Sequence, residues 1–272
     1  MPDDAGIGVR AFVEQIMGIP VSVHIRAHRP GRDVIATAVA AVFARLSRAE
    51  AIFSTWQPTS ELMRLRRGDL ALADADPSMR VVMDLCERAA SVTGGLFTTD
   101  LVAPDGTRGW DPTGLVKGWA VDDAAAVLRT VDRIAFSINA GGDIVCGLGR
   151  LSDALANTWN IGIEDPADRS RISRVLPITV GAIATSSAAA RGAHIIDPRT
   201  GAGLTHPGSA TVTGPELVWA DVWATTTFID PTALGRSDGF ADYRLWTIDL
   251  PRPASDTRRS LRCRGSAPSS AS

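Results

Sequence analysis

Two oxygen-bearing side chains in residues 219–228, Asp221 and Thr225, are four positions apart, a spacing that places both on one face of a helix. A carboxylate and a hydroxyl in this arrangement could bind a hard cation such as Mg²⁺ through their oxygens. A surface carboxylate that hydrogen-bonds to a threonine would have the same spacing. The pair therefore indicates a candidate metal site and leaves this structural alternative open.

His194 marks a second candidate site in GAHIIDPRTGAG, residues 192–203. The two isoleucines after it are β-branched and predict a buried strand, and Asp197-Pro198 followed by glycine predicts the turn that ends this strand. A histidine held there could accept a proton, because the ordinary pKa of its side chain lies near neutrality. The alternative is that His194 is a hydrogen-bonded core residue and that Asp197 only stabilises the turn.

Three further segments could contact a nucleotide. Residues 111–124, DPTGLVKGWAVDDA, run from a turn into a helix whose first N–H groups could face phosphates, with Lys117 as a point charge. Residues 138–147 place two glycines between strands, where a backbone can approach a ligand closely. Trp56 offers a planar surface ahead of a helix that Ser60 caps. Taken singly, each segment is better explained by an ordinary turn, cap or packing role.

Several common motifs are absent from the sequence. No GxGxxG follows a predicted strand, and there is no GxxxxGK[ST] loop and no GxSxG elbow. His24 and His28 have the spacing of a helical zinc pair, but they lie at the end of a predicted strand and cannot share a helix face. Cys86, Cys146 and Cys263 are far apart with no CxxC pair, which favours a reducing compartment over a zinc site or disulfides.

The composition is that of an ordinary globular protein. The chain has 272 residues, of which 45% are hydrophobic and 21% charged, enough for a large core. Its net charge of -2 disfavours nucleic acid or an anionic membrane as a partner. The N-terminus resembles no secretory signal, and no apolar run is long enough to span a membrane. We therefore expect a cytoplasmic protein without a membrane span.

The elements that must position these residues mix helices and strands without a strict βαβ repeat. This pattern predicts an α+β fold with mixed or antiparallel sheets and packed helices. The predicted helices are 33–53, 77–91, 117–128 and 216–227. The predicted strands are 9–18, 19–27, 134–139, 143–147, 159–164, 181–187, 194–197, 210–214 and 243–248. We expect residues 1–250 to form a single catalytic domain and residues 251–272, rich in Pro, Ser and Arg, to be a disordered tail.

Taken in order, these segments resemble the ApbE family of flavin transferases, the FAD:protein FMN transferases, from Met17 to about Phe228. The eight-residue HIIDPRTG at 194–201 is complete and is the most specific match. Thr98 stands where the family usually has an aspartate. The other matching segments are 17–18, 54–56, 95–98, 111–122, 139–143, 184–187 and 221–225.

The resemblance implies a set of site residues. Those that match the FAD-binding positions of the family are Met17, Trp56, Leu96, Phe97, Thr98, Asp111, Lys117 and Ile195. Asp221, Thr225 and the backbone carbonyl of Gly114 match its magnesium site. The turn after Ile196 would hold His194 near the reacting phosphate, as the catalytic base.

The resemblance also implies the reaction: Mg²⁺-dependent transfer of FMN from FAD to a Ser or Thr hydroxyl of a target flavoprotein, with release of AMP. Two alternatives remain open, an Mg²⁺-dependent FAD pyrophosphatase that yields FMN and AMP, and a non-catalytic FAD-binding protein. The sequence shows no match to the lipoprotein leader of many family members, which again implies a cytoplasmic protein.

Overall fold

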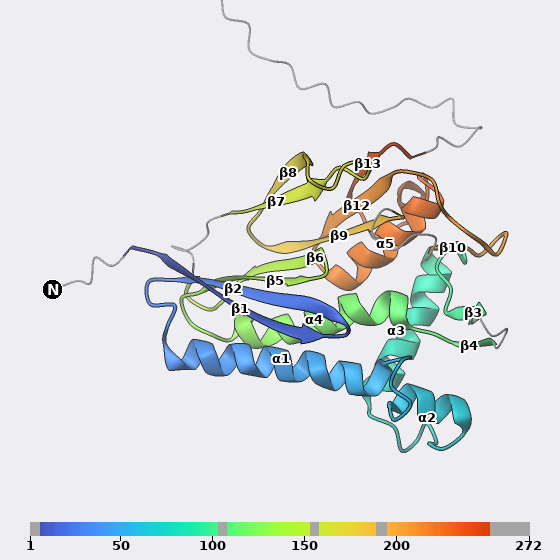
Figure 1. The fold of residues 1–272 in the computed structure, drawn as a ribbon, viewed down its shortest axis with the longest axis horizontal. Helices are drawn as coiled ribbons and strands as arrows, with labels where there is room; N and C mark the ends of the chain where they lie inside the picture. The colour runs from blue at the N-terminus through green and yellow to red at the C-terminus, as the bar shows by residue number, and fades with distance from the viewer. Residues whose placement is uncertain (1–5, 103–107, 153–157, 189–194, 251–272) are drawn as a thin grey trace, which may run out of the picture.

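A seven-stranded sheet lies at the centre of the protein in the computed structural model, which describes residues 6–102, 108–152, 158–188 and 195–250 (Figure 1). Its strands, in order across the sheet, are β1 (Gly8–Ile16), β2 (Ile19–Ala27), β5 (Ala135–Ala140), β6 (Asp143–Leu148), β9 (Gly181–Ser187), β12 (Ser209–Gly214) and β13 (Arg244–Ile248). Every neighbouring pair is antiparallel. The predicted α+β class is therefore confirmed.

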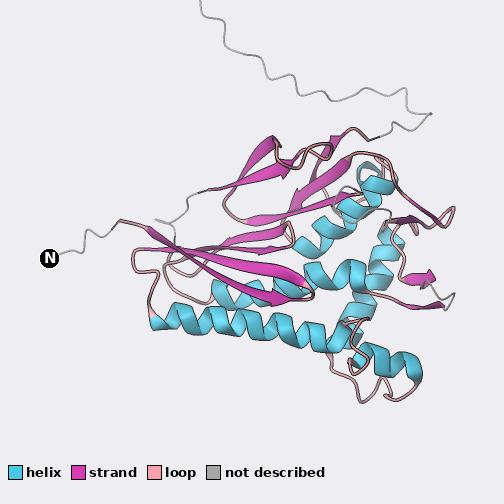
Figure 2. Ribbon diagram, in the orientation of Figure 1, coloured by secondary structure: helices cyan, strands magenta, loops and turns pink. Residues whose placement is uncertain are grey.

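Three helices cover one face of this sheet, as Figure 2 shows: α1 (Asp33–Phe53), α4 (Thr113–Arg129) and α5 (Leu217–Ile229). Helix α4 contacts both α1 and α5. Apolar side chains of α1 recur every three or four residues and form the stripe that faces the core. They include Ile35, Val39, Val42 and Leu46. The shorter helices are α2 (Glu61–Arg67), α3 (Ser78–Val92) and the 3₁₀ turn η2 (Leu234–Arg236).

The hairpin of β7 (Trp159–Glu164) and β8 (Ile172–Ile178) covers part of the opposite face. Its Ile163 and Leu176 pack with Ile183 of β9, whereas the alanines on either side of Ile183 belong to the core under the helices. Side chains alternate between the two faces of a strand, so the sheet is covered on both sides here. Two short strand pairs complete the fold: β3 (Asp100–Val102) with β4 (Arg108–Trp110), and β10 (Ile196–Asp197) with β11 (Ala202–Gly203).

The observed elements differ from the predicted ones in several places: the short strands β3, β4 and β11 were not predicted, and β10 begins at Ile196 rather than at 194. Helix α4 begins at Thr113 rather than at Lys117, because the Asp111 carboxylate accepts a hydrogen bond from Thr113 N at 3.0 Å and starts the helix earlier. The sequence does not predict β8. Its segment ISRVLPI has an arginine and a proline that interrupt the apolar pattern, and most of its side chains are exposed. The tail 251–272 lies outside the described residues. Within those residues, no helix combines the length and apolar character that a membrane span needs.

Gly118 lets α4 and α5 approach closely. A Cβ at this position would lie 2.8 Å from Cα of Val218 and 3.1 Å from the Leu217 carbonyl oxygen. We therefore expect Gly118→Ala to lower the free energy of unfolding by about 1–3 kcal/mol, the usual cost of overpacking a core. Urea denaturation would measure this loss. Gly235→Ala is the control, because a Cβ there meets nothing within 4 Å. Equal losses in the two variants would contradict the helix contact as the cause.

Candidate active site

One cavity of about 1110 Å³ opens where the β1–β2 turn, the C-terminal end of α1, the N-terminal end of α4 and helix α5 meet. It is lined by all the predicted site residues that the structure describes: Met17, Trp56, Leu96, Phe97, Thr98, Asp111, Gly114, Lys117, Ile195, Asp221 and Thr225. His194, the predicted base, lies outside the described residues. The fold thus brings distant segments to one place, and the roles of their residues stay predictions.

Met17 lies in a strained turn at the edge of this cavity. Met17 and Gly18 connect β1 to β2 with φ angles of 56° and 69°. Hairpin turns with positive φ at both residues match the twist of the two strands. For a methionine, this left-handed conformation costs on the order of 1 kcal/mol. The side chain packs against the core, and Met17 lines the cavity.

Trp56 stands on a loop that a serine network holds in place. The Ser54 hydroxyl accepts hydrogen bonds from Trp56 N and Gln57 N, each at 3.2 Å. Ser60 caps α2 by accepting from Met63 N at 3.2 Å, and its hydroxyl donates to the Ser54 carbonyl oxygen at 2.6 Å. The Trp56 side chain is 92% exposed at the cavity wall. The predicted cap is therefore present, and the loop offers an uncovered aromatic plane.

Phe97 forms the floor under the start of α4. Its backbone N–H donates to the Thr93 hydroxyl at 3.0 Å, and this hydroxyl donates to the Ala89 carbonyl oxygen at 2.7 Å. A Cβ added to Gly114 would lie 3.5 Å from the Phe97 ring, so the ring lies directly beside this glycine. Asp111 lies at the mouth of the same turn, with one carboxylate oxygen 3.8 Å from the Arg66 guanidinium. The cavity therefore joins an apolar floor to the charged N-terminal end of α4.

Lys117 forms the charged centre of the cavity together with two buried carboxylates. Its ammonium is in direct contact with Asp143 and lies 3.5 Å from Asp221 Oδ2. Asp143 and Asp221 are only 3% and 7% exposed. The Asp143 carboxylate also accepts from Thr185 N at 3.1 Å. Buried carboxylates of this kind need a positive partner, and Lys117 serves both.

Asp143 is a site residue that the sequence reasoning did not assign. It follows the glycines of the β5–β6 turn, whose φ angles are 65° and 104°. Asn139 fixes this turn by accepting from Gly142 N at 2.9 Å. The position of this aspartate, directly after two glycines between predicted strands, was the feature of the sequence that could have indicated it. Only the folded chain shows that its partner is Lys117.

The magnesium assignment fits the donor atoms that the structure provides. Asp221 and Thr225 lie on successive turns of α5, and Gly114 lies in the first turn of α4. Asp221 is buried rather than on the surface, and the Thr225 hydroxyl lies 3.1 Å from the Ser186 hydroxyl. The described residues contain no group of three or more His, Cys, Asp or Glu that could hold a metal. A small set of oxygen ligands completed by phosphate and water suits Mg²⁺.

Asp197 has a structural role in the turn after the predicted strand. Its carboxylate accepts from Arg199 N at 2.9 Å and from the Arg199 guanidinium at 2.8 Å. The hydrogen bond from the Arg199 side chain is the main reason that the pKa of Asp197 lies below its usual value. Ile195, two positions earlier, is 6% exposed and packs with Phe228. The structure therefore supports the turn-stabilising alternative for Asp197.

The β7–β8 hairpin supplies a further wall of the cavity that the sequence did not indicate. Gly162, Glu164 and Arg169 of this hairpin line the cavity, and the two charged side chains form an ion pair at 2.9 Å. Gly162 and Glu164 lie on β7, a strand that was predicted, but the sequence did not indicate that this hairpin lies over the cavity. The serine and threonine hydroxyls at the end of β9 also line the cavity.

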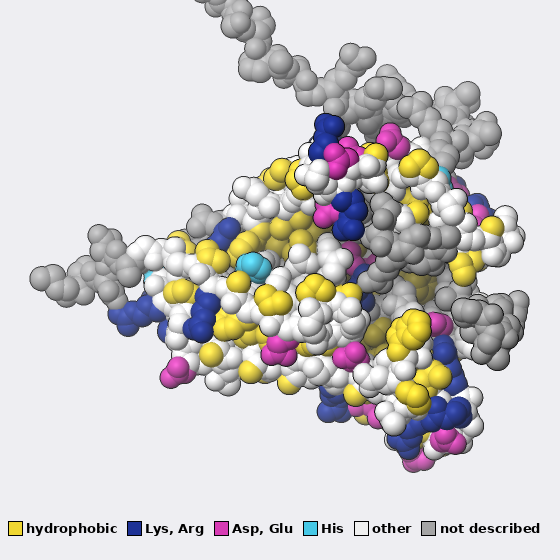
Figure 3. Space-filling view, viewed as in Figure 1, with side chains coloured by type: hydrophobic (Ala, Val, Ile, Leu, Met, Phe, Trp, Pro, Cys, Tyr) yellow, Lys and Arg dark blue, Asp and Glu magenta, His cyan; other side chains and the backbone are white. Residues whose placement is uncertain are grey.

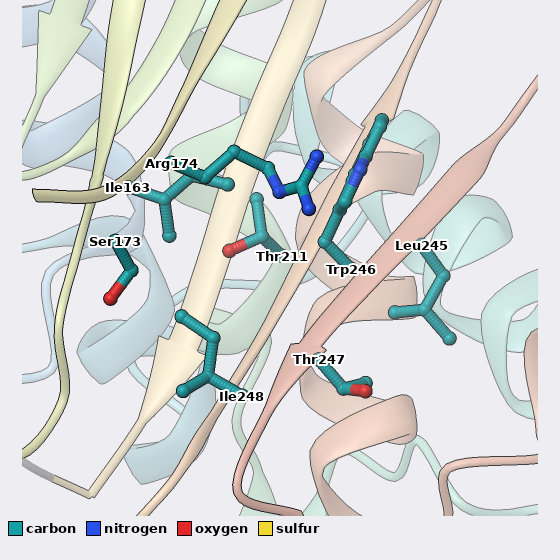
Figure 4. Close-up of a pocket in the computed structure, with 8 residues that line it drawn as sticks. All are labelled: Ile163, Ser173, Arg174, Thr211, Leu245, Trp246, Thr247 and Ile248. Atoms are coloured by element: carbon teal, nitrogen blue, oxygen red, sulfur yellow. The ribbon is translucent and has the colours of Figure 1, made fainter. Parts of the chain in front are cut away.

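A second, smaller cavity of about 430 Å³ lies between β8 and β13 (Figure 4). Its lining residues are Ile163, Ser173, Arg174, Thr211, Leu245, Trp246, Thr247 and Ile248. Arg174 points toward Trp246 in this view. The lining contains no carboxylate and none of the predicted site residues. The predicted site residues that the structure describes therefore all line the larger cavity.

Charged side chains of both signs are present on the face of the molecule that Figure 3 shows, where they are interspersed. The net charge of the whole chain is -2. Nucleic-acid-binding proteins usually gather Lys and Arg on one face or stripe.

Comparison with known sequences identifies two kinds of similarity. A family model described as ApbE family matches residues 17–104 and 101–238. The chain is 29% identical over 119 residues to an FAD:protein FMN transferase of Klebsiella pneumoniae (strain 342). That alignment covers 40% of the present chain and 33% of the relative, so the chain matches about a third of the length of this curated protein.

Solved structures share the fold over most of the chain. The flavin transferase ApbE from Vibrio cholerae matches with a TM-score of 0.66 and 20% identity, covering 90% of this chain and 98% of its own. The ApbE protein from Thermotoga maritima has a TM-score of 0.66 and 19% identity, covering 82% and 87%. The apo form of the flavinyl transferase ApbE from Pseudomonas stutzeri has a TM-score of 0.65 and 17% identity, covering 84% and 87%.

Proposed function

Because the chain belongs to the ApbE family, we propose that it is an enzyme that transfers FMN from FAD to a serine or threonine hydroxyl of an acceptor flavoprotein and releases AMP. The observation that carries this proposal is the convergence of all the described site residues on one cavity. The relative from Klebsiella pneumoniae is an FAD:protein FMN transferase. The proposed reaction gives all of these residues a role in one site.

The cavity offers separate groups for the two chemical parts of FAD. Met17, Phe97 and Ile195 are apolar, and Trp56 is planar, so they suit the isoalloxazine ring. Lys117 is a cation in the same cavity and suits the pyrophosphate. A ligand with an aromatic body and an anionic link therefore matches the lining in chemical type.

Magnesium would be held by Asp221, Thr225 and the Gly114 carbonyl. When bound, this ion neutralises charge on the pyrophosphate, which is the main requirement of phosphoryl transfer. The Lys117 ammonium lies 3.5 Å from Asp221 Oδ2 and would add positive charge on the same side of the cavity. Its contact with Asp143 holds the ammonium on the cavity side of α4.

The reaction is a displacement at phosphorus. The acceptor oxygen forms a bond to the phosphorus of the FMN half, and the bond from this phosphorus to the bridging oxygen breaks. AMP leaves with the bridging oxygen and its electron pair. The proton of the acceptor hydroxyl passes to His194, the residue that precedes Ile195 of the cavity wall.

The products distinguish this function from its alternatives. The purified protein would be incubated with FAD, Mg²⁺ and flavoproteins or peptides that carry Ser or Thr, and the products would be analysed by mass spectrometry. A covalent gain of the mass of FMN on the acceptor, together with AMP, supports transfer. Free FMN and AMP in equal amounts would indicate a pyrophosphatase with water as acceptor. Unchanged FAD with measurable binding would indicate a non-catalytic flavin protein.

We expect the protein to bind FAD at least about tenfold more tightly than FMN in the presence of Mg²⁺, a difference of about 1.4 kcal/mol. FMN lacks the adenosine half and the pyrophosphate that Lys117 and the metal ligands would contact. Calorimetric titration would measure both affinities. The same titrations without Mg²⁺ are the control and should reduce the preference for FAD. Equal affinity for the two flavins under both conditions would contradict the assignment.

A further inference from the structure

The proposed metal site is divided between two helices. Gly114 and Lys117 lie on α4, whereas Asp221 and Thr225 lie on α5. The ion pair between Lys117 Nζ and Asp221 Oδ2, at 3.5 Å, connects the two helices. An axial shift of one helix on the other would therefore separate groups that must act together.

The two helices meet at a backbone contact that leaves little freedom. Gly118 of α4 lies against the first turn of α5, where an added Cβ would come within 2.8 Å of Val218 Cα. This contact sets how closely the helices approach. A contact through a glycine does not by itself prevent one helix from sliding along the other.

Asp122 supplies the missing axial restraint. It lies four residues after Gly118, on the same face of α4. Its Oδ2 accepts a hydrogen bond from Val218 N at 2.8 Å, although the two residues are 96 positions apart in sequence. Glu216, the N-cap residue of α5, makes no cap hydrogen bond through its side chain. The first turn of α5 is thus capped by the neighbouring helix.

The environment of Asp122 makes this a costly way to cap a helix. Burial is the main cause that raises the pKa of Asp122 to about 6, and the backbone N–H groups of Val218 and Leu217 offset only part of this effect. Glu216 raises this pKa further, whereas Arg129 lowers it. A serine, threonine or aspartate of α5 itself could cap the helix without a buried charge. The bond between the two helices therefore indicates that the position of α5 on α4 must be fixed.

We propose that Asp122 is a positioning residue for the magnesium site, which sets the axial position of α5 on α4 through its bond to Val218 N. Val218 is three residues before Asp221, less than one helical turn, so the restraint acts next to the metal ligand. This inference rests on the proposed function, because it assumes that Asp221 and Thr225 bind Mg²⁺.

The test compares Asp122→Ala with Asp122→Asn. Calorimetric FAD binding would be measured over a range of Mg²⁺ concentrations. We expect Asp122→Ala to need roughly tenfold more Mg²⁺ for half-maximal enhancement of FAD binding, as is typical when a group that orients metal ligands is removed. FAD affinity without Mg²⁺ should change less than about twofold. Asp122→Asn should stay near the wild-type Mg²⁺ requirement, because the amide oxygen still accepts from Val218 N.

Ile35→Val is the control for a general loss of stability, since Ile35 is fully buried in α1 and does not line the cavity. Its Mg²⁺ requirement should equal that of the wild type. If Asp122→Ala does not fold, Asp122→Ser replaces it, because the shorter side chain should lose the bond to Val218 N and raise the Mg²⁺ requirement in the same way. A wild-type Mg²⁺ requirement in folded Asp122→Ala or Asp122→Ser would overturn the inference. If Mg²⁺ has no effect on the FAD affinity of the wild-type protein, the magnesium site itself is refuted, and the inference with it.

Discussion

Asp221→Ala is expected to reduce FMN transfer by at least about 10³-fold while some FAD binding remains. Asp221 carries the only full charge among the proposed metal ligands, and a bound metal contributes several kcal/mol to stabilising a phosphoryl-transfer transition state. The substitution also removes one of the two carboxylates beside Lys117. Turnover would be measured as the rate of AMP release at saturating FAD, with the Mg²⁺ concentration varied up to a large excess.

Two further variants separate lost chemistry from lost packing. Asp221→Asn keeps the side-chain volume of this 7% exposed position but removes the charge, so it should lose nearly as much activity as Asp221→Ala. Asp123→Ala removes a carboxylate of α4 that is paired at the surface with Arg45 at 3.1 Å. It should change turnover less than about twofold, since surface pairs contribute little. If Asp221→Ala turns over at the wild-type rate in excess Mg²⁺, Asp221 is not a metal ligand.

His194→Asn is expected to lower turnover by roughly 10²- to 10⁴-fold, the usual effect of removing a general base. Asparagine is similar in breadth and polar, so FAD affinity should be retained. The base must be neutral to accept a proton, so the wild-type rate should rise with pH through a group near neutrality. This dependence should disappear in the variant. Rates of AMP release from about pH 5 to 9 would measure both effects.

The matched control for this substitution is His24→Asn, in β2. His24 lies against Trp159, with ring centroids 6.4 Å apart, and does not line the cavity. Its turnover should stay within about twofold of the wild type at every pH. If His194→Asn loses stability and FAD binding together, with turnover per bound FAD unchanged, His194 is a core residue. The assignments of Asp221, Thr225 and Gly114 would then still stand.

Local patterns in the sequence were sufficient for most of the elements. The first two strands and α1 follow from side-chain periodicity and turn residues, which act within a few positions of each other. The motif matches named the residues that line the cavity, because each motif is a short continuous segment. The β8 strand escaped because exposed side chains hide its periodicity. The wall formed by Glu164 and Arg169 was missed although β7 was predicted, because only the tertiary structure places the β7–β8 hairpin over the cavity.

Contacts between distant segments were decided only by the tertiary structure, and the adjacent aspartates of α4 illustrate the reason. In the sequence, Asp122 and Asp123 are neighbouring acidic residues of the segment 111–124. Consecutive side chains of a helix point about 100° apart, so one of them faces α5 and the other faces solvent. Asp123 pairs with Arg45 at the surface, whereas Asp122 accepts from Val218 N. The sequence determines that the two differ in direction, but the partner of each depends on how α1, α4 and α5 pack.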